Sequence, residues 1–171
     1  ISGGYPLCDG TATPKLFAHP QLVLEAMKTG KPYPIRALFS NANNTLISVP
    51  DSRHTYECLR HLDLFVYMDF FMTPTAELAD LVLPAALWPE VDSVFCMPEF
   101  GDVAALCMQK TVQVGECKSD EDFFLELCQH MGLDYGAACQ EDILNEILGE
   151  LGHRRKEYAE MDFAQFRQLG W

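Results

Sequence analysis

Short apolar runs alternate along the chain with segments in which apolar residues recur at helical spacing. The run at residues 64–68 and the run that ends before Pro84 have no polar face, which is typical of parallel strands covered by helices, and a further strand is predicted at residues 35–39. Helical spacing and end signals predict helices from Pro20 to Gly30 and from Asp51 to His61. This order predicts a parallel sheet whose strands end at one shared edge, where open α/β sheets bind ligands.

The second half of the chain has a less regular pattern. Residues 94–115 show little periodicity, with one strand predicted at residues 111–114. A cap and an acidic first turn at residues 118–122 favour the start of a helix. The helices predicted in this half cover residues 118–132, 141–151 and 162–169.

These elements predict the α/β class, as a Rossmann-like three-layer domain with a mostly parallel sheet and a helical C-terminal tail. The 171 residues are enough for one domain with a substantial core. We therefore expect a single domain over residues 1–171, with an irregular lead-in at residues 1–18 and a helical appendage at residues 140–171.

The charge balance limits the partners that this chain can bind. Its 25 acidic and 12 basic residues give a net charge of −13, which argues against nucleic acid and anionic membranes, since both require a cationic surface. An anionic cofactor stays possible, because helix N-termini and loop amides bind phosphate without lysine. We also expect no membrane span, since no apolar run is long enough. Residues 1–5 carry no signal-peptide pattern, and the compartment is not indicated.

Cysteine and histidine spacing does not predict a metal site within the chain. The seven cysteines lie ten or more residues apart, so neither a zinc ribbon nor an iron–sulfur cluster held by this chain alone is expected. His54, Cys58 and His61 fall on one stripe of a predicted helix and could bind zinc. A solvated histidine beside a packed cysteine is the simpler account, because a fourth ligand is not evident.

One motif carries a family resemblance. The string D-F-F-M-T-P-T-A-E-L-A-D-L-V-L-P-A-A-L-W-P-E at residues 69–90 resembles the signature D-x-F-x-T-E-T-A-x-x-A-D-x-V-L-P of the molybdopterin oxidoreductases, the dimethyl sulfoxide reductase and formate dehydrogenase superfamily. The similarity extends over residues 30–132. The string T-G-K-P-Y-P-I at residues 29–35 is similar to the thiosulfate/polysulfide reductase branch.

The resemblance implies that this chain is a fragment of a larger enzyme and holds the guanine nucleotide half of a bis-molybdopterin guanine dinucleotide cofactor. It implies molybdenum or tungsten ligated from another domain, and an iron–sulfur cluster outside this fragment. The implied partners are the remaining domains of the parent chain and an electron-transfer subunit. The fragment alone is then not catalytic, and no catalytic or metal-ligating residue is assigned in it.

The resemblance also implies where the cofactor is bound. Asp69 ends a buried strand, and its carboxylate could accept two hydrogen bonds from the edge of guanine, or could cap the following turn. Asp120 could reach the same cofactor, or could complement the dipole of the helix that it begins. Thr75 could bind the cofactor or cap a helix. The predicted cofactor-binding residues are Ser40, Asn41, Asn43, Met68, Asp69, Thr75 and Asp120.

The chain departs from the family pattern at several positions in or next to the predicted cofactor-binding residues. Members commonly show G-x-N-P after the first strand; here Asn43 matches, while Asn41 and Asn44 replace the glycine and the proline. Met68 stands where many members have glutamine, and Pro74 replaces the glutamate of the E-T pair.

Other functional classes stay open from the sequence. One is a stand-alone module that binds a nucleotide or handles a cofactor, and another is part of a non-redox hydratase on the same scaffold. Glu90 and Asp92 could form an acid–base pair, although chance placement in so acidic a chain is the simpler account.

Overall fold

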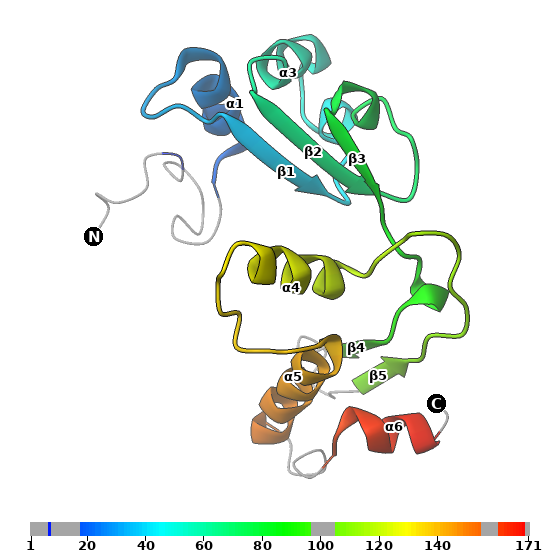
Figure 1. Cartoon of the computed structure of the whole chain (residues 1–171). Helices are drawn as coiled ribbons and strands as arrows, with labels where there is room; N and C mark the ends of the chain where they lie inside the picture. The colour runs from blue at the N-terminus through cyan, green and yellow to red at the C-terminus, as the bar shows by residue number, and fades with distance from the viewer. Residues whose placement is uncertain (1–6, 8–17, 97–104, 155–160, 170–171) are drawn as a thin grey trace. The chain divides into compact units, whose positions relative to one another are not determined.

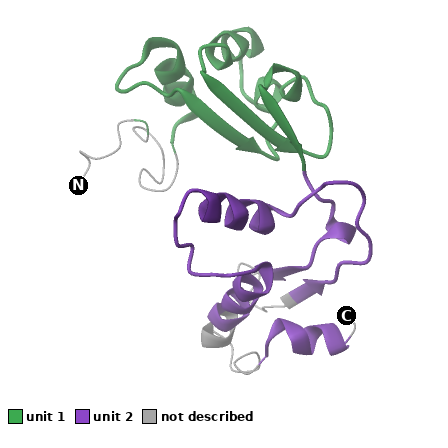
Figure 2. Cartoon of the chain, in the orientation of Figure 1, with its two compact units in different colours: residues 1–84 green, residues 85–171 purple. Residues whose placement is uncertain are grey.

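The computed structural model describes residues 7, 18–96, 105–154 and 161–169 (Figure 1). The expected irregular lead-in lies outside these residues, apart from Leu7 and Ala18. The chain divides into two compact units, unit 1 (Ile1–Pro84) and unit 2 (Ala85–Trp171) (Figure 2). Each unit has a buried core of its own, and the grouping of both into one domain stays a prediction.

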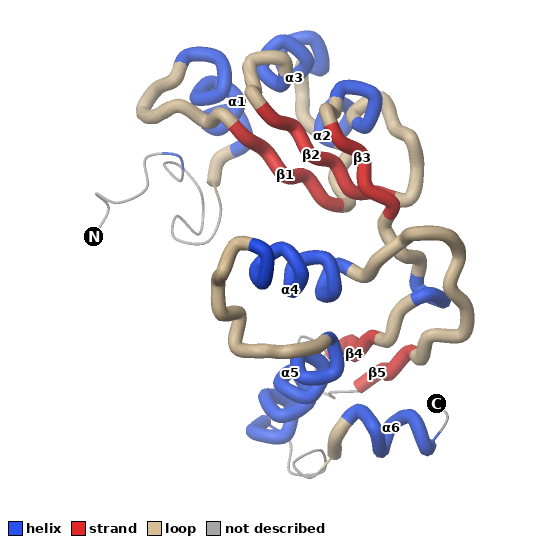
Figure 3. Tube along the Cα trace, in the orientation of Figure 1, coloured by secondary structure: helices blue, strands red, loops and turns tan. Residues whose placement is uncertain are grey.

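Unit 1 is built on a three-stranded parallel sheet, drawn in red in Figure 3. The strands β1 (Ala37–Asn41), β2 (Leu64–Asp69) and β3 (Leu81–Pro84) lie in that order. In their register Asn41 is opposite Met68, and Asp69 is opposite Pro84. The carboxyl ends of all three strands therefore meet at one edge, and the predicted α/β class with a parallel sheet is confirmed.

Four helical elements accompany this sheet: α1 (Pro20–Thr29), α2 (Thr45–Ser48), α3 (Ser52–Leu59) and the 3-10 helix η2 (Ala76–Leu78). Helix α1 has proline in its first turn and ends at Gly30, whose φ of 71° is left-handed, as the sequence predicts. Helix α3 begins after Asp51, whose side chain accepts a hydrogen bond from the His54 amide.

The core of unit 1 lies between the helices and one face of β2. Phe65 and Tyr67, two residues apart and therefore on the same face of the strand, pack with ring centroids 6.1 Å apart in an edge-to-face arrangement. Helices α1 and α3 pack against each other and contribute to this core. Its buried members are Leu24, Met27, Cys58, Leu59, Phe65, Tyr67 and Ala76. This packing fixes Tyr67 close to the carboxyl end of its strand.

Unit 2 combines an antiparallel strand pair with three helices: β4 (Ser93–Cys96), β5 (Ala105–Met108), α4 (Asp120–His130), α5 (Gln140–Arg154) and α6 (Phe163–Leu169). Its core joins Val94 of β4 to Leu144 and Leu148 of α5 and to Phe163 of α6. The three predicted helices of this half are confirmed, and the last two pack in the core of unit 2.

The strand predicted at residues 111–114 is wrong. The Thr111 and Val112 amides both donate to the Pro89 carbonyl oxygen, at 2.9 and 3.2 Å, and the Val114 amide donates to the Glu90 carboxylate. Alternation of β-branched residues favours a strand only where a neighbouring strand accepts its hydrogen bonds. Here a turn and a side chain accept them instead, while the paired strands lie at β4 and β5.

Among the described residues, none of the helices combines the length and the apolar character that crossing a membrane requires.

Candidate functional site

Two loops lie side by side where β1 and β2 end. The Ala42 amide donates to the Met68 carbonyl oxygen over 3.1 Å, so the first loop stays attached to the end of β2. Ala42 has a left-handed φ of 50°, which costs a residue other than glycine roughly 1–2 kcal/mol. Backbone strain of this kind concentrates at functional loops. Asn43, which follows β1, and Asp69, the last residue of β2, are thus at the same edge of the sheet.

Two partly buried hydrogen bonds tie the two loops together. The Thr75 hydroxyl donates to the Asn44 side-chain oxygen over 2.6 Å and accepts from the Leu46 amide over 3.0 Å. The Thr75 side chain is 0% exposed, and it makes no capping bond at the start of η2. Its hydroxyl therefore serves the link between the loops, whereas its predicted contact with a cofactor stays a prediction.

Asp69 presents a half-buried carboxylate whose two oxygens each accept one internal hydrogen bond. The Tyr67 hydroxyl donates to Oδ2 over 2.7 Å, and the Phe70 amide donates to Oδ1 over 2.6 Å. An ionised carboxylate accepts about four hydrogen bonds in total. Asp69 therefore helps to close its own turn, as the capping alternative requires, and still has acceptor positions for a ligand.

The Tyr67 hydroxyl itself accepts a hydrogen bond from a neighbouring side chain. The Thr73 hydroxyl donates to the Tyr67 oxygen over 3.1 Å, and the Ala76 amide donates to the Thr73 oxygen over 3.2 Å. Tyr67 is 0% exposed, and burial raises the pKa of its hydroxyl, with the Asp69 carboxylate raising it further. Tyr67 thus stays protonated at neutral pH and donates to the carboxylate.

A hollow of about 350 Å³ lies beside the end of β1. Ser40, Asn41 and Asn43 lie at its polar end, and most of the remaining wall is made by apolar side chains of α1 and β1 together with Val49 and Leu59. The Ser40 hydroxyl donates to the Asn43 carbonyl oxygen over 3.4 Å. Within the described part of the chain, the side-chain amide donors of Asn41 and Asn43 contact no protein acceptor. Three of the seven predicted cofactor-binding residues are therefore brought to one cavity with amide donors available.

The other two predicted residues are placed differently. Met68 is 1% exposed, and by strand alternation its side chain is on the face opposite to Tyr67. Asp120 is exposed at the first position of α4 in unit 2, directly after Ser119, whose side chain accepts from the Asp122 amide. The position of Asp120 at a helix N-terminus agrees with the dipole alternative.

The histidine–cysteine stripe of α3 is arranged for packing and ion pairing. His54 Nε2 lies 3.2 Å from a Glu25 carboxylate oxygen and 3.4 Å from Cys58 Sγ. The ring of His61 bonds to the Glu57 carbonyl oxygen, 2.8 Å away. Burial raises the pKa of the Cys58 thiol, whereas zinc requires a thiolate. These contacts support the packed-cysteine account.

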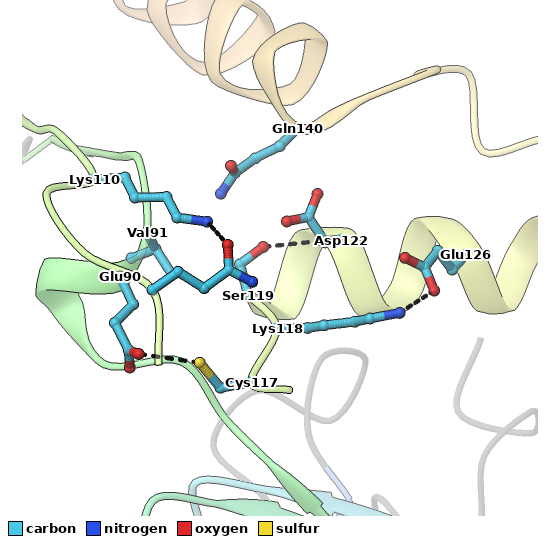
Figure 4. Close-up of a pocket in the computed structure, with 10 residues that line it drawn as sticks. Glu90, Val91, Lys110, Cys117, Lys118, Ser119, Asp122, Glu126 and Gln140 are labelled. Atoms are coloured by element: carbon cyan, nitrogen blue, oxygen red, sulfur yellow. Dashed lines mark hydrogen bonds and ion pairs between the residues drawn. The ribbon is translucent and has the colours of Figure 1, made fainter. Parts of the chain in front are cut away.

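Figure 4 shows a second hollow, of about 230 Å³, within unit 2. Glu90 lies at its wall and is 8% exposed. One of its carboxylate oxygens accepts from the Leu87 amide over 2.9 Å. The other accepts from the Val114 amide over 2.9 Å and from the Cys117 thiol over 3.1 Å. The carboxylate therefore closes its own turn and ties it to the loop at residues 114–117.

These hydrogen bonds shift the pKa values of Glu90 and Cys117 in opposite directions. The Leu87 amide, the Cys117 thiol and the Val114 amide hold the pKa of Glu90 below its usual range, and the Glu90 carboxylate raises the pKa of Cys117. Asp92 is engaged elsewhere, since it accepts from the Lys110 amide and pairs with Arg167. The two acids have separate partners, so the geometry does not support an acid–base pair.

Comparison with known proteins shows the family. The profile of the molybdopterin oxidoreductases matches residues 12–130. Acetylene hydratase of Syntrophotalea acetylenica is 34% identical over 146 residues, which cover 82% of this chain and 20% of the relative. F420-dependent formate dehydrogenase subunit alpha of Methanocaldococcus jannaschii is 35% identical over 132 residues, covering 75% of this chain and 18% of the relative. A solved structure of acetylene hydratase from Pelobacter acetylenicus matches with a TM-score of 0.72 at 31% identity, over 89% of this chain and 20% of that one.

This chain belongs to the molybdopterin oxidoreductase family, as its resemblance predicted. The family match extends through residues of both compact units. The chain spans about a fifth of the length of the relatives described above.

Sequence analysis missed three residues that build the site: Asn44, Tyr67 and Thr73. For Tyr67 a signal existed, because a tyrosine two positions before Asp69 shares its face of the strand. For Asn44 there was none, since its partner Thr75 lies 31 residues away and no local pattern links them.

Replacing Thr75 by valine tests the link between the loops. Thr75→Val keeps the shape of the side chain but leaves the partly buried Asn44 oxygen and Leu46 amide without their partner, so we expect a loss of about 1–3 kcal/mol in the free energy of unfolding. Urea denaturation measures it. Thr55→Val is the matched control: Thr55 is also 0% exposed, but its hydroxyl has no partner in the described part of the chain. Equal losses in both variants would contradict a stabilising link.

Glu90 should make the stability of unit 2 depend on pH. Because its folded-state pKa is lowered, its contribution is present above the unfolded-state value of about 4.3 and is lost as pH falls through the folded-state pKa. Glu90→Gln should therefore melt at a lower temperature than the wild type at pH 7, and this difference should shrink between about pH 5 and pH 3. Melting curves across this range test the expectation. Glu150→Gln, at an exposed position of α5, is the control. A difference in melting temperature between Glu90→Gln and the wild type that stays constant across this pH range would refute the expectation.

Proposed function

We propose that this chain holds the guanine nucleotide half of a molybdopterin guanine dinucleotide in a larger molybdenum or tungsten enzyme. The observation that carries the proposal is the Asp69 carboxylate, half-buried at the carboxyl edge of the sheet, with one internal donor on each oxygen. Ligands of open α/β sheets bind at this edge. Membership of the molybdopterin oxidoreductase family supports the cofactor class.

The chemistry of the edge fits a guanine base. Guanine presents two adjacent donors, N1–H and its 2-amino group, and a carboxylate presents two adjacent acceptors. Adenine lacks this pair of donors, so it would leave the carboxylate without matching hydrogen bonds. Asp69 is the residue that would read the base.

Donors at the end of β1 fit the anionic part of the same nucleotide. The side-chain amides of Asn41 and Asn43 line the hollow next to β1, and N–H donors can bind phosphate oxygens without a cation. This matters in a chain with a net charge of −13. The apolar wall of the hollow would exclude water from these contacts and strengthen them.

The chain contributes binding and orientation. When bound, the metal–dithiolene centre of the cofactor supplies oxygen-atom or electron transfer. The metal ligand, the iron–sulfur cluster and any electron-transfer subunit are then contributed by the remaining domains and partners of the parent protein. Asp69, Asn41 and Asn43 fix one end of a long cofactor, which sets the position of its other end.

A hydratase on the same scaffold is the second candidate for the parent protein. The observation that favours it is the 34% identity to an acetylene hydratase, together with the structural match to that enzyme. Formate dehydrogenase is matched at 35% identity, so similarity alone does not separate the two. Metal analysis and assays of the intact parent for hydration and for redox activity distinguish them. A stand-alone module is distinguished by the parent reading frame, since codons for a cluster-binding segment would exclude it.

Exchanging one acceptor of Asp69 for a donor should change the base that is preferred. In Asp69→Asn, Oδ1 still accepts while Nδ2 donates, which matches xanthine, whose N1–H is followed by a carbonyl oxygen. We expect the ratio of Kd values for guanosine and xanthosine diphosphates to shift by roughly 10- to 100-fold toward xanthosine. Isothermal titration calorimetry on the 171-residue chain measures both constants.

Asp63→Asn is the control for this exchange. Asp63 precedes β2 at its other end and pairs with Arg36, so its variant should keep the wild-type ratio. An Asp69→Asn chain that is folded by circular dichroism and retains the wild-type ratio would rule out Asp69 as the reader of the base.

A further inference from the structure

We propose that Tyr67 is a positioning residue, which orients the Asp69 carboxylate so that both of its oxygens face the donor pair of a guanine base. This inference rests on the proposed function and adds to it a determinant of base selectivity. It assigns a role to a buried hydroxyl that belongs to the core of unit 1 and lies outside the family motif, which begins at Asp69.

The ring of Tyr67 is held on all sides. It is 0% exposed, packs edge-to-face on Phe65 at 6.1 Å and belongs to the core formed with α1 and α3. A ring in a close-packed core has few accessible rotamers. Its hydroxyl oxygen therefore occupies a defined position 2.7 Å from Asp69 Oδ2, which a flexible surface residue would not provide.

Three successive hydrogen bonds lead from the Ala76 amide to Asp69, and each donor in this chain points toward Asp69. The Ala76 amide donates to the Thr73 oxygen (3.2 Å), the Thr73 hydroxyl donates to Tyr67 (3.1 Å), and the Tyr67 hydroxyl donates to Asp69 Oδ2 (2.7 Å). Each donor in such a chain is polarised by the bond behind it, which strengthens the last bond. The raised pKa of Tyr67 agrees with a hydroxyl that keeps its proton.

The two internal donors together fix the plane of the carboxylate. Phe70 donates its amide to Oδ1 and Tyr67 donates its hydroxyl to Oδ2, so rotation of the group about its Cβ–Cγ bond would break both bonds. A fixed plane lowers the entropy lost when a ligand makes two hydrogen bonds at once. Without the Tyr67 hydroxyl, only the hydrogen bond from the Phe70 amide would hold the carboxylate. The carboxylate could then rotate about its Cβ–Cγ bond and accept one of the two guanine donors at a time.

Comparing guanosine diphosphate with inosine diphosphate tests this difference. Hypoxanthine lacks the 2-amino group and makes one hydrogen bond where guanine makes two. Tyr67→Phe should lower the preference for guanosine over inosine diphosphate by about threefold to tenfold, the net effect of one hydrogen bond, mainly through weaker binding of guanosine diphosphate. Calorimetric titration of the 171-residue chain gives both Kd values, and urea denaturation of the same samples records the change in stability.

Three further variants make the test specific. Tyr33→Phe removes a hydroxyl from a tyrosine that is 45% exposed, and it should leave the preference unchanged. Thr73→Val interrupts the hydrogen-bond chain behind Tyr67 and should lower the preference to a smaller extent, whereas Thr73→Ser, which keeps the hydroxyl, should restore it. This pair also tests the inference if Tyr67→Phe does not fold.

The outcomes separate this inference from the proposed function. Equal weakening of both nucleotides by Tyr67→Phe, or an unchanged preference in a folded Tyr67→Phe chain whose Asp69→Asn counterpart has switched to xanthosine, would overturn the positioning role and leave the proposed function standing. A wild-type chain that does not distinguish guanosine from adenosine diphosphate would overturn the proposed function, and the positioning role with it.

Discussion

Parallel pairing of β1 with β2 is the constraint on which the candidate site depends. In parallel strands the carboxyl ends meet at one edge, but the chain then leaves each strand in its own direction, toward α2 after β1 and toward η2 after β2. Three hydrogen bonds keep the loops together beyond the last paired residues: Ala42 to Met68 through the backbone, the Leu46 amide to the Thr75 hydroxyl, and Thr75 to Asn44 through side chains. The site is therefore an extension of the sheet, maintained by polar contacts where the ladder stops.

Asp69 shows how structural and ligand-binding roles coexist in one carboxylate. In the described residues no lysine or arginine contacts it, and N–H and O–H donors stabilise its charge instead. A paired cation would occupy the acceptor positions that a base requires. The Tyr67 hydroxyl and the Phe70 amide each occupy one acceptor position of the Asp69 carboxylate and leave its other acceptor positions available to a ligand. The capping interpretation and the base-binding interpretation of Asp69 are thus compatible.

Local patterns predicted the three strands of unit 1, its helices α1 and α3 and the shared edge of its sheet, but not the short helix α2. Apolar strand composition, Pro20, Gly30 and the Asp51 cap are signals carried by neighbouring residues, and the structure confirms the elements that they predict. Polar contacts across the loops could not be predicted in the same way, because their partners meet only after the sheet forms.

Unit 2 shows the converse limit. The alternating residues at 111–114 have the composition of a strand, yet the acceptors for their amides are Pro89 and Glu90, which precede them by more than twenty residues. The residues of β4 and β5 pair with each other although neither segment stands out by periodicity. Strand formation depends on the partner, and the partner is a property of the fold.

The departures from the family pattern have a physical explanation at one position. Where members commonly have proline, Asn44 has a φ of −75°, close to the value that a proline ring imposes. The φ angle at this position is therefore compatible with a proline. In exchange, the asparagine supplies the oxygen that accepts the Thr75 hydroxyl, while a proline now stands at position 74, directly before that threonine. The hydrogen bond between Thr75 and Asn44 restrains the first loop against the second, so the geometry of the edge depends on the pair rather than on either loop alone.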